Sequence, residues 1–201
     1  QSPIPNPQSP IPNPHFISYF FQYLKIYLFS INLLKLIKIK DIHKNSMEGK
    51  KIIVFYYSYS TMSTEKLVKG IQSSFPNMEI LLLPSEEKND VSSYDYVGFA
   101  SGIYAWDFGK PIYEKLAKLQ GLEGKKCFSL CTSTAGYEKY TLYPKDAIEK
   151  KGGKFIGGWG CLGKAVFFPL NMVGGVNKVK PDEEDFKNGT EFLKKLIEEN
   201  P

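Results

Sequence analysis

Residues 47–201 predict an α/β domain in which helices cover both faces of a five-stranded, mainly parallel sheet, giving three layers. Short apolar runs alternate along this stretch with segments of helical periodicity, and this alternation is typical of βαβ units. The first run, 52–57, is apolar at every position, as expected for a strand that is buried on both faces. The 155 residues of this stretch are enough for five strands and four or five helices.

Each expected strand is a short apolar or β-branched run that is bounded by turn-forming or polar residues. The second run stops at Pro84, because proline cannot donate to a sheet ladder. The last run is assigned to a strand despite its glycines, since it follows the Gly152-Gly153 break. The predicted strands span 52–57, 79–83, 94–100, 126–131 and 154–160.

The segments between these strands carry apolar residues at helical spacing. In 64–75, Leu67, Ile71 and Phe75 fall on one stripe. A second helix, 111–120, has proline at its start and Gly121 just beyond its end, and a weaker one is expected over 140–151. The last helix opens at Pro181, and its first turn is Asp182-Glu183-Glu184-Asp185, which suits the positive end of the helix dipole.

Residues 1–46 differ in composition from the rest and are interpreted as an extension outside the domain. They contain no glycine, repeat the segment 1–7 as 8–14, and carry five lysines and one aspartate, a net charge of +4. Residues 47–201 carry 21 lysines and 20 acidic residues, a net charge of +1. We expect the extension to be disordered or translated upstream sequence, with Met47 as the natural start. Two alternatives stay open: a membrane or interfacial anchor at 16–40, and a targeting peptide.

Composition also excludes several classes of function for the domain. The chain has no arginine, which argues against nucleic-acid binding. Both histidines, His15 and His43, lie in the extension, so the domain cannot hold a histidine-based catalytic triad. Its three cysteines lack metal-ligand spacing and are expected to be reduced, buried thiols in a cytosolic protein, with no metal site and no catalytic side chain. They are Cys127, Cys131 and Cys161.

The loop after the first strand, 58–64, is expected to bind a phosphate. Five of its seven residues carry aliphatic hydroxyls, and it runs directly into a helix, whose first N–H groups bind anions. The alternative is an ordinary helix cap by Ser63 or Thr64. The glycine patterns of P-loops and of dinucleotide-binding folds do not follow this strand. Strand-end carboxylates of phosphorylation receivers are also missing at 57–58 and 100–101.

Here the chain resembles the flavodoxin family over about 150 residues. The stretch 54–67 resembles that family's first strand and FMN-phosphate loop, and 101–106 and 131–137 are similar to the two loops beside the flavin ring. The tail 160–185 looks like a subgroup of short flavodoxin-family proteins. The resemblance implies a flavodoxin-like fold with strand order 2-1-3-4-5 and FMN as cofactor. It assigns to FMN the residues Ser58, Tyr59, Ser60, Thr61, Met62, Ser63, Thr64, Ser101, Gly102, Ile103, Tyr104, Trp106, Thr132, Ser133, Thr134, Gly136 and Tyr137.

Three aromatic residues in these loops, Tyr104, Trp106 and Tyr137, can be interpreted in two ways. They either pack against the flavin or belong to the core and rim of the protein. The resemblance implies an FMN-binding electron carrier in the cytosol whose partners are redox proteins or small-molecule electron donors and acceptors. The alternatives are an FMN-dependent NAD(P)H or quinone oxidoreductase with a pocket shaped by 162–180, a degenerate binding module without flavin, and a form tethered to a membrane.

Overall fold

The computed structural model of the chain describes residues 25, 27–29, 49–166, 172 and 174–201. The chain divides into two units, 1–45 and 46–201. In the first unit the described residues, Lys25 and 27–29, are helical. The rest of the expected extension and the expected start at Met47 lie outside the described residues. No helix among the described residues is long and apolar enough to cross a membrane.

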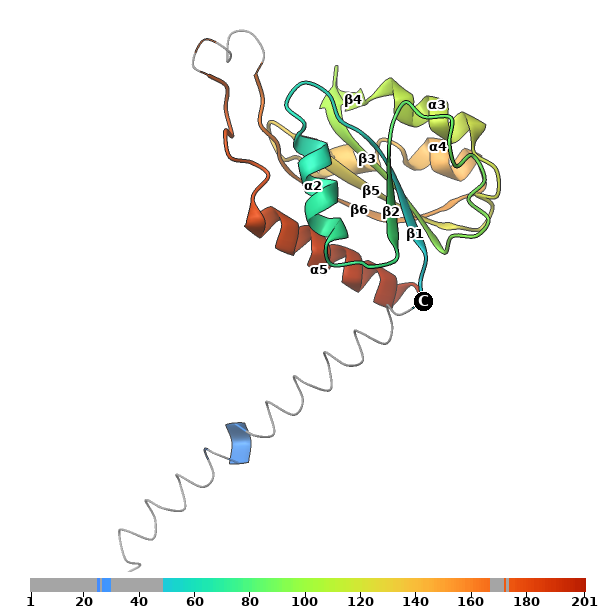
Figure 1. The fold of residues 1–201 in the computed structure, drawn as a ribbon, viewed down its shortest axis with the longest axis horizontal. Coiled ribbons are helices and arrows are strands. Elements are labelled where there is room, and N and C mark those ends of the chain that lie inside the picture. Colours follow the sequence, from blue (N-terminus) through green and yellow to red (C-terminus); the bar gives the residue numbers. More distant parts are fainter. Residues whose placement is uncertain (1–24, 26, 30–48, 167–171, 173) are drawn as a thin grey trace, which may run out of the picture. The chain divides into compact units, whose positions relative to one another are not determined.

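The second unit is a twisted sheet with helices on both of its faces (Figure 1). Its parallel strands lie in the order β2-β1-β3-β5-β6, and a short strand, β4, pairs antiparallel with β3. Because β5 and β6 are the fourth and fifth predicted strands, the predicted order 2-1-3-4-5 is confirmed. The strands are β1 (Ile52–Tyr57), β2 (Met78–Leu82), β3 (Tyr96–Tyr104), β4 (Asp107–Phe108), β5 (Lys126–Ser133) and β6 (Lys154–Leu162).

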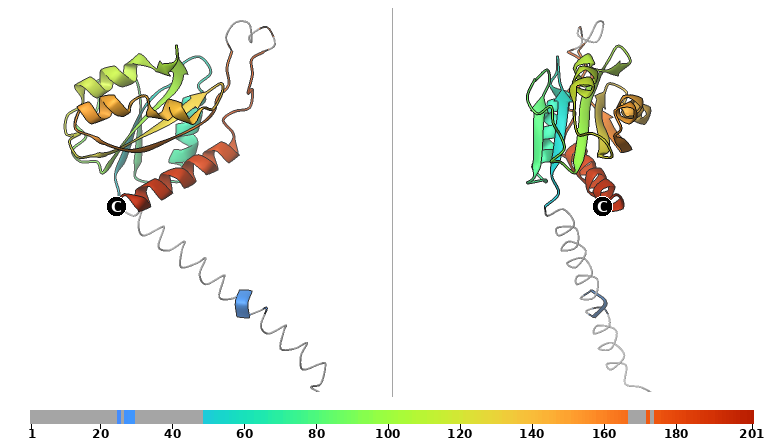
Figure 2. Two further views of the ribbon diagram at one scale, coloured as in Figure 1. Left: turned by 180° about the vertical axis from the view of Figure 1, so that it is seen from behind. Right: turned by 90° about the vertical axis from the view of Figure 1, so that its right-hand side faces the viewer.

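Helices lie on both faces of the sheet and give the predicted three layers (Figure 2), and a hydrophobic core fills the space on each face. Alternate residues of β1 point to opposite faces, so that Val54 belongs to one core and Phe55 to the other. Helices α2 (Ser63–Gln72) and α5 (Glu183–Glu199) cover the first core. Helices α3 (Lys110–Lys118) and α4 (Lys145–Lys150) and the 3-10 helix η1 (Glu138–Leu142) cover the second.

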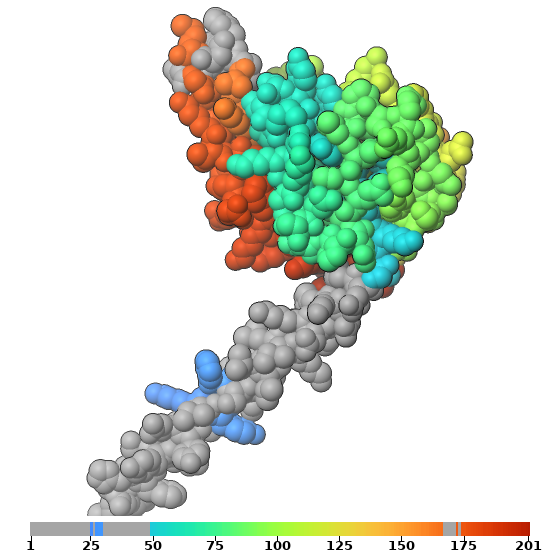
Figure 3. All heavy atoms as spheres, viewed as in Figure 1, coloured from blue at the N-terminus to red at the C-terminus, as the bar shows by residue number. Residues whose placement is uncertain are grey.

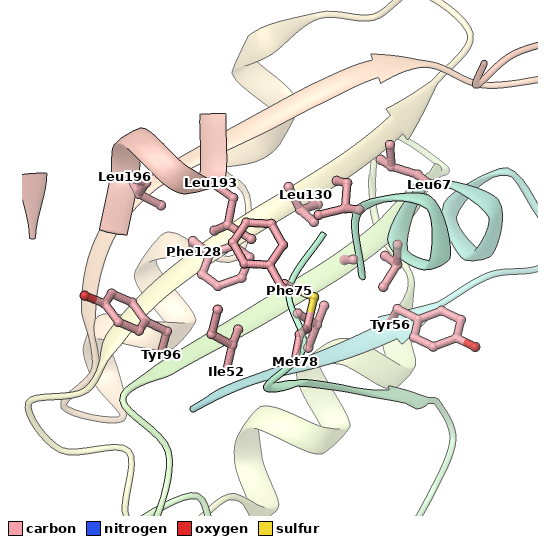
Figure 4. Close-up of a cluster of buried hydrophobic side chains, with 14 of the residues drawn as sticks. Ile52, Tyr56, Leu67, Phe75, Met78, Tyr96, Phe128, Leu130, Leu193 and Leu196 are labelled. Atoms are coloured by element: carbon pink, nitrogen blue, oxygen red, sulfur yellow. The ribbon is translucent and has the colours of Figure 1, made fainter. Parts of the chain in front are cut away.

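The first core is built from the helical stripe that the sequence predicts. Figure 4 shows Leu67 of α2 and Leu193 and Leu196 of α5 packed over the strand residues Phe128 and Leu130. Leu67 and Leu193 are fully buried, and a side chain of this size gains about 1.5–3 kcal/mol when it leaves water. Packing of this kind fixes the start of α2 against the ends of the central strands, where the candidate site lies.

Three strands, β3, β5 and β6, run further than their apolar runs predicted. β3 and β5 continue to pair through Gly102 and Thr132, and β5 and β6 pair as far as Ser133 and Leu162. The ladder is made by backbone groups, so it does not stop where the side chains become polar. Residues 101–104 and 132–133, which were expected in loops, are therefore strand residues.

Two further features differ from the prediction. The chain reverses after Tyr104 to form β4, with Ala105 and Trp106 both at positive φ, 49° and 70°, as in a two-residue hairpin turn. The helix expected over 140–151 is divided into η1 and α4, because Pro144 cannot donate a helical hydrogen bond and its ring blocks the preceding turn.

Candidate functional site

A cavity of about 320 Å³ lies at the carboxyl ends of β1, β3, β5 and β6. This is the edge at which open parallel sheets bind ligands. Twelve of the residues predicted to bind a cofactor line the cavity, together with four from the segment after β6. The lining residues are Ser58, Tyr59, Ser60, Thr61, Ser63, Thr64, Gly102, Ile103, Tyr104, Thr132, Ser133, Thr134, Gly163, Lys164, Ala165 and Val166.

The loop between β1 and α2 wraps around the first turn of the helix. Ser60 and Met62 both take positive φ, 68° and 55°, although neither is a glycine. The Oγ of Ser58 accepts a hydrogen bond of 3.1 Å from the N–H of Glu65. Ser58 therefore caps this helix turn, and not Ser63 or Thr64, which the alternative interpretation of the loop had named. The N–H groups of those two residues find no acceptor among the described residues.

The hydroxyls of this loop join it to neighbouring segments. The Oγ1 of Thr61 lies 2.9 Å from the Oγ of Ser63, and the Oγ1 of Thr64 lies 2.8 Å from that of Thr132 at the end of β5. Ser60 is exposed, and its hydroxyl has no partner in the part of the chain that the structure describes. The loop thus offers a rigid set of hydroxyls at the positive end of a helix.

The end of β3 forms a second wall of the cavity through Gly102, Ile103 and Tyr104. The hydroxyl of Tyr104 accepts a 2.9 Å hydrogen bond from the N–H of Tyr59, and its ring meets that of Tyr57 edge-on at 5.4 Å. Burial raises the pKa of the Tyr104 phenol, so this hydroxyl stays protonated at neutral pH. Tyr104 therefore ties the β3 wall to the loop after β1.

Five of the predicted cofactor residues do not line the cavity. Ser101 is buried, where its Oγ donates to the carbonyl of Gly102 and accepts from the N–H of Gly109 at the start of α3. Met62, Trp106 and Tyr137 are exposed side chains, with 43%, 79% and 55% of their surface accessible. Gly136, at φ 64°, lies in a turn.

The third wall comes from the end of β5. Thr132, Ser133 and Thr134 line the cavity, and the Oγ of Ser133 accepts a 2.8 Å hydrogen bond from the N–H of Gly136, which holds the turn that follows. The side-chain amide of Asn177 donates to the carbonyls of Thr134 and Gly163. This amide fixes the β5 wall to the segment after β6.

The segment 163–166 lines the cavity, although its residues were not among those assigned to FMN from the sequence. As part of a site it was named only in the oxidoreductase alternative, within 162–180, because nothing in its residues indicates a phosphate site. Figure 3 shows this orange region beside the teal loop at the start of α2. The segment 162–180, expected to shape a substrate pocket, lies partly outside the described residues.

Comparison with known proteins places this geometry in context. No family model matches the chain. The uncharacterized protein MJ0298 of Methanocaldococcus jannaschii is 30% identical over 149 residues, which are 73% of this chain and 98% of the relative. The chain belongs to the MJ0298 family.

Solved structures show that this MJ0298-family chain has the flavodoxin fold. Oxidised flavodoxin 2 of Bacillus cereus matches with a TM-score of 0.55 and 16% identity, covering 75% of this chain and 99% of its own. The two-electron reduced flavodoxin of Megasphaera elsdenii matches with a TM-score of 0.53 and 16% identity, covering 73% of this chain and 98% of its own. A flavodoxin from the domain Archaea matches with a TM-score of 0.51 and 11% identity, covering 74% of this chain and 97% of its own. The fold-level resemblance inferred from the sequence is confirmed.

The described groups of the cavity are suited to binding an anion. They are hydroxyls, backbone amides and one lysine, and none of the described lining residues carries a carboxylate, a thiol or an imidazole. The three cysteines lie on β5 and β6 and are buried. Burial raises the pKa of the Cys127 and Cys131 thiols to about 12 and that of Cys161 still further. Neutral thiols of this kind are poor nucleophiles.

Proposed function

We propose that this domain binds FMN at the carboxyl edge of its sheet and transfers electrons through it. The observation that carries the proposal is the set of hydroxyls at the start of α2, next to the N–H groups of Ser63 and Thr64, which have no acceptor among the described residues. Hydroxyls and helix-start amides are the groups that hold phosphates in proteins. The cavity, at about 320 Å³, is at the lower end of the range of about 300–1,000 Å³ for small-molecule sites.

The walls of the cavity suit the two ends of FMN differently. The free hydroxyl of Ser60 and the N–H groups of Ser63 and Thr64 would donate to the phosphate. The hydroxyls of Thr61 and Ser63 bond to each other and to the main chain of Lys164, and would hold the loop in place. The wall from Gly102 to Tyr104 on one side and the hydroxyl-bearing end of β5 on the other would hold the ring. Tyr104 keeps its phenol protonated and is fixed by Tyr59, so it would present an oriented surface to the ring rather than a reactive group.

When bound, FMN supplies the electron-transfer chemistry, while the protein binds it, orients it and sets its environment. The flavodoxins of B. cereus and M. elsdenii that share the fold are described in the oxidised and the two-electron reduced form, respectively, which agrees with a redox role for this edge of the sheet. We further propose that the protein is cytosolic and that it exchanges electrons with redox proteins or with small-molecule donors and acceptors. It assigns no catalytic side chain.

The proposal is tested by titrating the full chain with FMN and following the quenching of flavin fluorescence. In the triple variant Ser60→Ala, Thr61→Ala, Ser63→Ala we expect the affinity to fall at least tenfold, about 1.4 kcal/mol, because the Ser60 bond to the phosphate and the bonds that hold the phosphate loop in place are lost together. The matched control is Ser73→Ala with Ser74→Ala, which removes hydroxyls beyond the other end of the same helix. Equal affinities of the triple variant and the wild type would remove the phosphate assignment.

A second candidate is an FMN-dependent NAD(P)H or quinone oxidoreductase. It is favoured by Lys164, Ala165 and Val166, which extend the cavity wall beyond the three loops next to the flavin site. Oxidation of NAD(P)H in the presence of a quinone and FMN separates this enzyme from a carrier, since a carrier alone does not turn over these small molecules. A degenerate module is separated from both by its failure to take up FMN.

A further inference from the structure

The segment after β6 is fixed against the loop that precedes α2, although the two are about a hundred residues apart in sequence. The N–H of Lys164 donates a 3.1 Å hydrogen bond to the Oγ of Ser63, and the Oγ1 of Thr61 donates one of 2.9 Å to the carbonyl of Lys164. Both bonds involve the main chain of Lys164, one on each side of its Cα. The backbone of Lys164 is thereby held beside two hydroxyls of the proposed phosphate site.

Gly163 permits this close approach. A Cβ at this position would lie 3.1 Å from the Cβ of Thr132 and 3.2 Å from the Cβ of Ser63, which is closer than ordinary van der Waals contact. The N–H of Gly163 also donates a 2.8 Å hydrogen bond to the carbonyl of Ser133. The position of Lys164 is therefore a property of the packed site and not of an independent loop.

The side chain of Lys164 is free to serve a ligand. Lys164 lines the cavity and is exposed, and it makes no ion pair with any carboxylate in the part of the chain that the structure describes. Two other lysines near α2 are already engaged. The ammonium of Lys66 donates to the carbonyls of Val179 and Pro181, and that of Lys180 pairs with Asp182 and Asp185.

The acidic residue nearest in sequence to this loop does not compete for Lys164. Glu65, in the first turn of α2, forms an i,i+4 ion pair with Lys69, and the loop 58–64 itself contains no charged residue. An exposed lysine whose main chain is bonded to uncharged hydroxyls can turn its ammonium toward a ligand in the cavity, and it favours a ligand that carries its charge on a compact, oxygen-rich group. Phosphomonoesters fit this description, and lysine binds them as a point charge.

We propose that the Lys164 ammonium is the counter-charge to the phosphate in this cavity and makes the site select FMN over riboflavin. The inference rests on the proposed function and deepens it: it assigns a specificity-determining residue that lies on a different segment from the phosphate loop. The hydroxyls and helix amides then orient the phosphate, and Lys164 adds the charge on which discrimination against the phosphate-free flavin depends.

The test compares FMN and riboflavin binding to the full chain and to Lys164→Met, which keeps an unbranched side chain and removes the charge. We expect FMN affinity to fall roughly fivefold, in the range for a partly exposed charge-assisted contact, and riboflavin affinity to stay within about twofold. Lys164→Arg should retain most of the FMN affinity, because it keeps the charge. Added salt should weaken FMN binding more in the wild type than in Lys164→Met.

Lys178→Met is the matched control, because Lys178 is exposed, makes no ion pair among the described residues and does not line the cavity. Equal losses for FMN and riboflavin in Lys164→Met, or an equal FMN loss in Lys178→Met, would overturn the role of Lys164 while leaving flavin binding intact. A wild-type chain that binds neither flavin would instead overturn the proposed function and this inference with it.

Discussion

The hydroxyl pair of Thr64 and Thr132 offers a direct way to separate the architecture of the site from its ligand binding. The two Oγ1 atoms lie 2.8 Å apart and join the first turn of α2 to the end of β5. Their residues are only 2% and 4% exposed, and both line the cavity. Valine has nearly the shape of threonine, so Thr64→Val, Thr132→Val and the double variant remove the hydroxyls one at a time and together.

The size of the effect follows from which hydroxyls remain. Each single variant leaves one hydroxyl without its partner, which costs about 1–3 kcal/mol in a buried place. Both residues line the cavity, which water can enter. We therefore expect each single variant to lose stability at the lower end of this range, about 1 kcal/mol. Removing both partners together is close to neutral. The predicted coupling free energy is therefore roughly 1–2 kcal/mol, with the double variant more stable than additivity allows.

Urea unfolding of the four proteins, followed by tryptophan fluorescence, measures these free energies. In thermal unfolding each 1 kcal/mol should correspond to about 2–4 °C in a domain of this size. The double variant should also bind FMN more weakly than the wild type, although it is nearly as stable. A double variant whose loss of stability equals the sum of the single losses would refute the claim that the two hydroxyls bond to each other.

Three further predictions concern residues outside the cavity. The native chain should resist a thiol reagent at pH 8, because burial raises the pKa values of Cys127, Cys131 and Cys161 well above this pH. All three thiols should react in urea. Rapid labelling of the native chain would contradict their burial. Lys115→Met should lower the free energy of unfolding by about 2–4 kcal/mol, because the buried Lys115 ammonium bonds to three oxygens of the loop 85–89. The exposed control Lys118→Met should lower it far less. Ala105→Gly should stabilise the chain by about 0.5–1 kcal/mol, because Ala105 has φ 49°, which glycine adopts without strain. Its control, Ala117→Gly in α3, should destabilise the chain by a similar amount. Urea unfolding measures the two lysine variants and the two alanine variants.

The sequence predicted most of the fold because its apolar runs and helical stripes are consistent with one another. The first strand, 52–57, was predicted with the bounds that the structure gives it, and the strand order followed from the family resemblance. The hydroxyl-rich loop was predicted to follow the carboxyl end of β1, and there it lines the cavity. These predictions depend on local patterns, which a sequence displays directly.

The parts that were missed depend on contacts between distant segments or on turns without a sequence signal. The hairpin of β3 and β4 turns on Ala105 and Trp106 at positive φ, where Asn or Gly is the usual indication. The contact of Lys164 with Thr61 and Ser63 spans more than a hundred residues, so no local pattern could reveal it. Ser101 was assigned to FMN from the resemblance, but its hydroxyl bonds to the backbone at the start of α3.

The central claim is that the edge of the sheet at the start of α2 holds a flavin phosphate. Its most direct test is the absorbance spectrum of the full chain after incubation with excess FMN and removal of the free flavin by gel filtration. We expect a protein fraction with the two visible bands of a flavin and about one FMN per chain. A colourless protein fraction from correctly folded chain would contradict the claim.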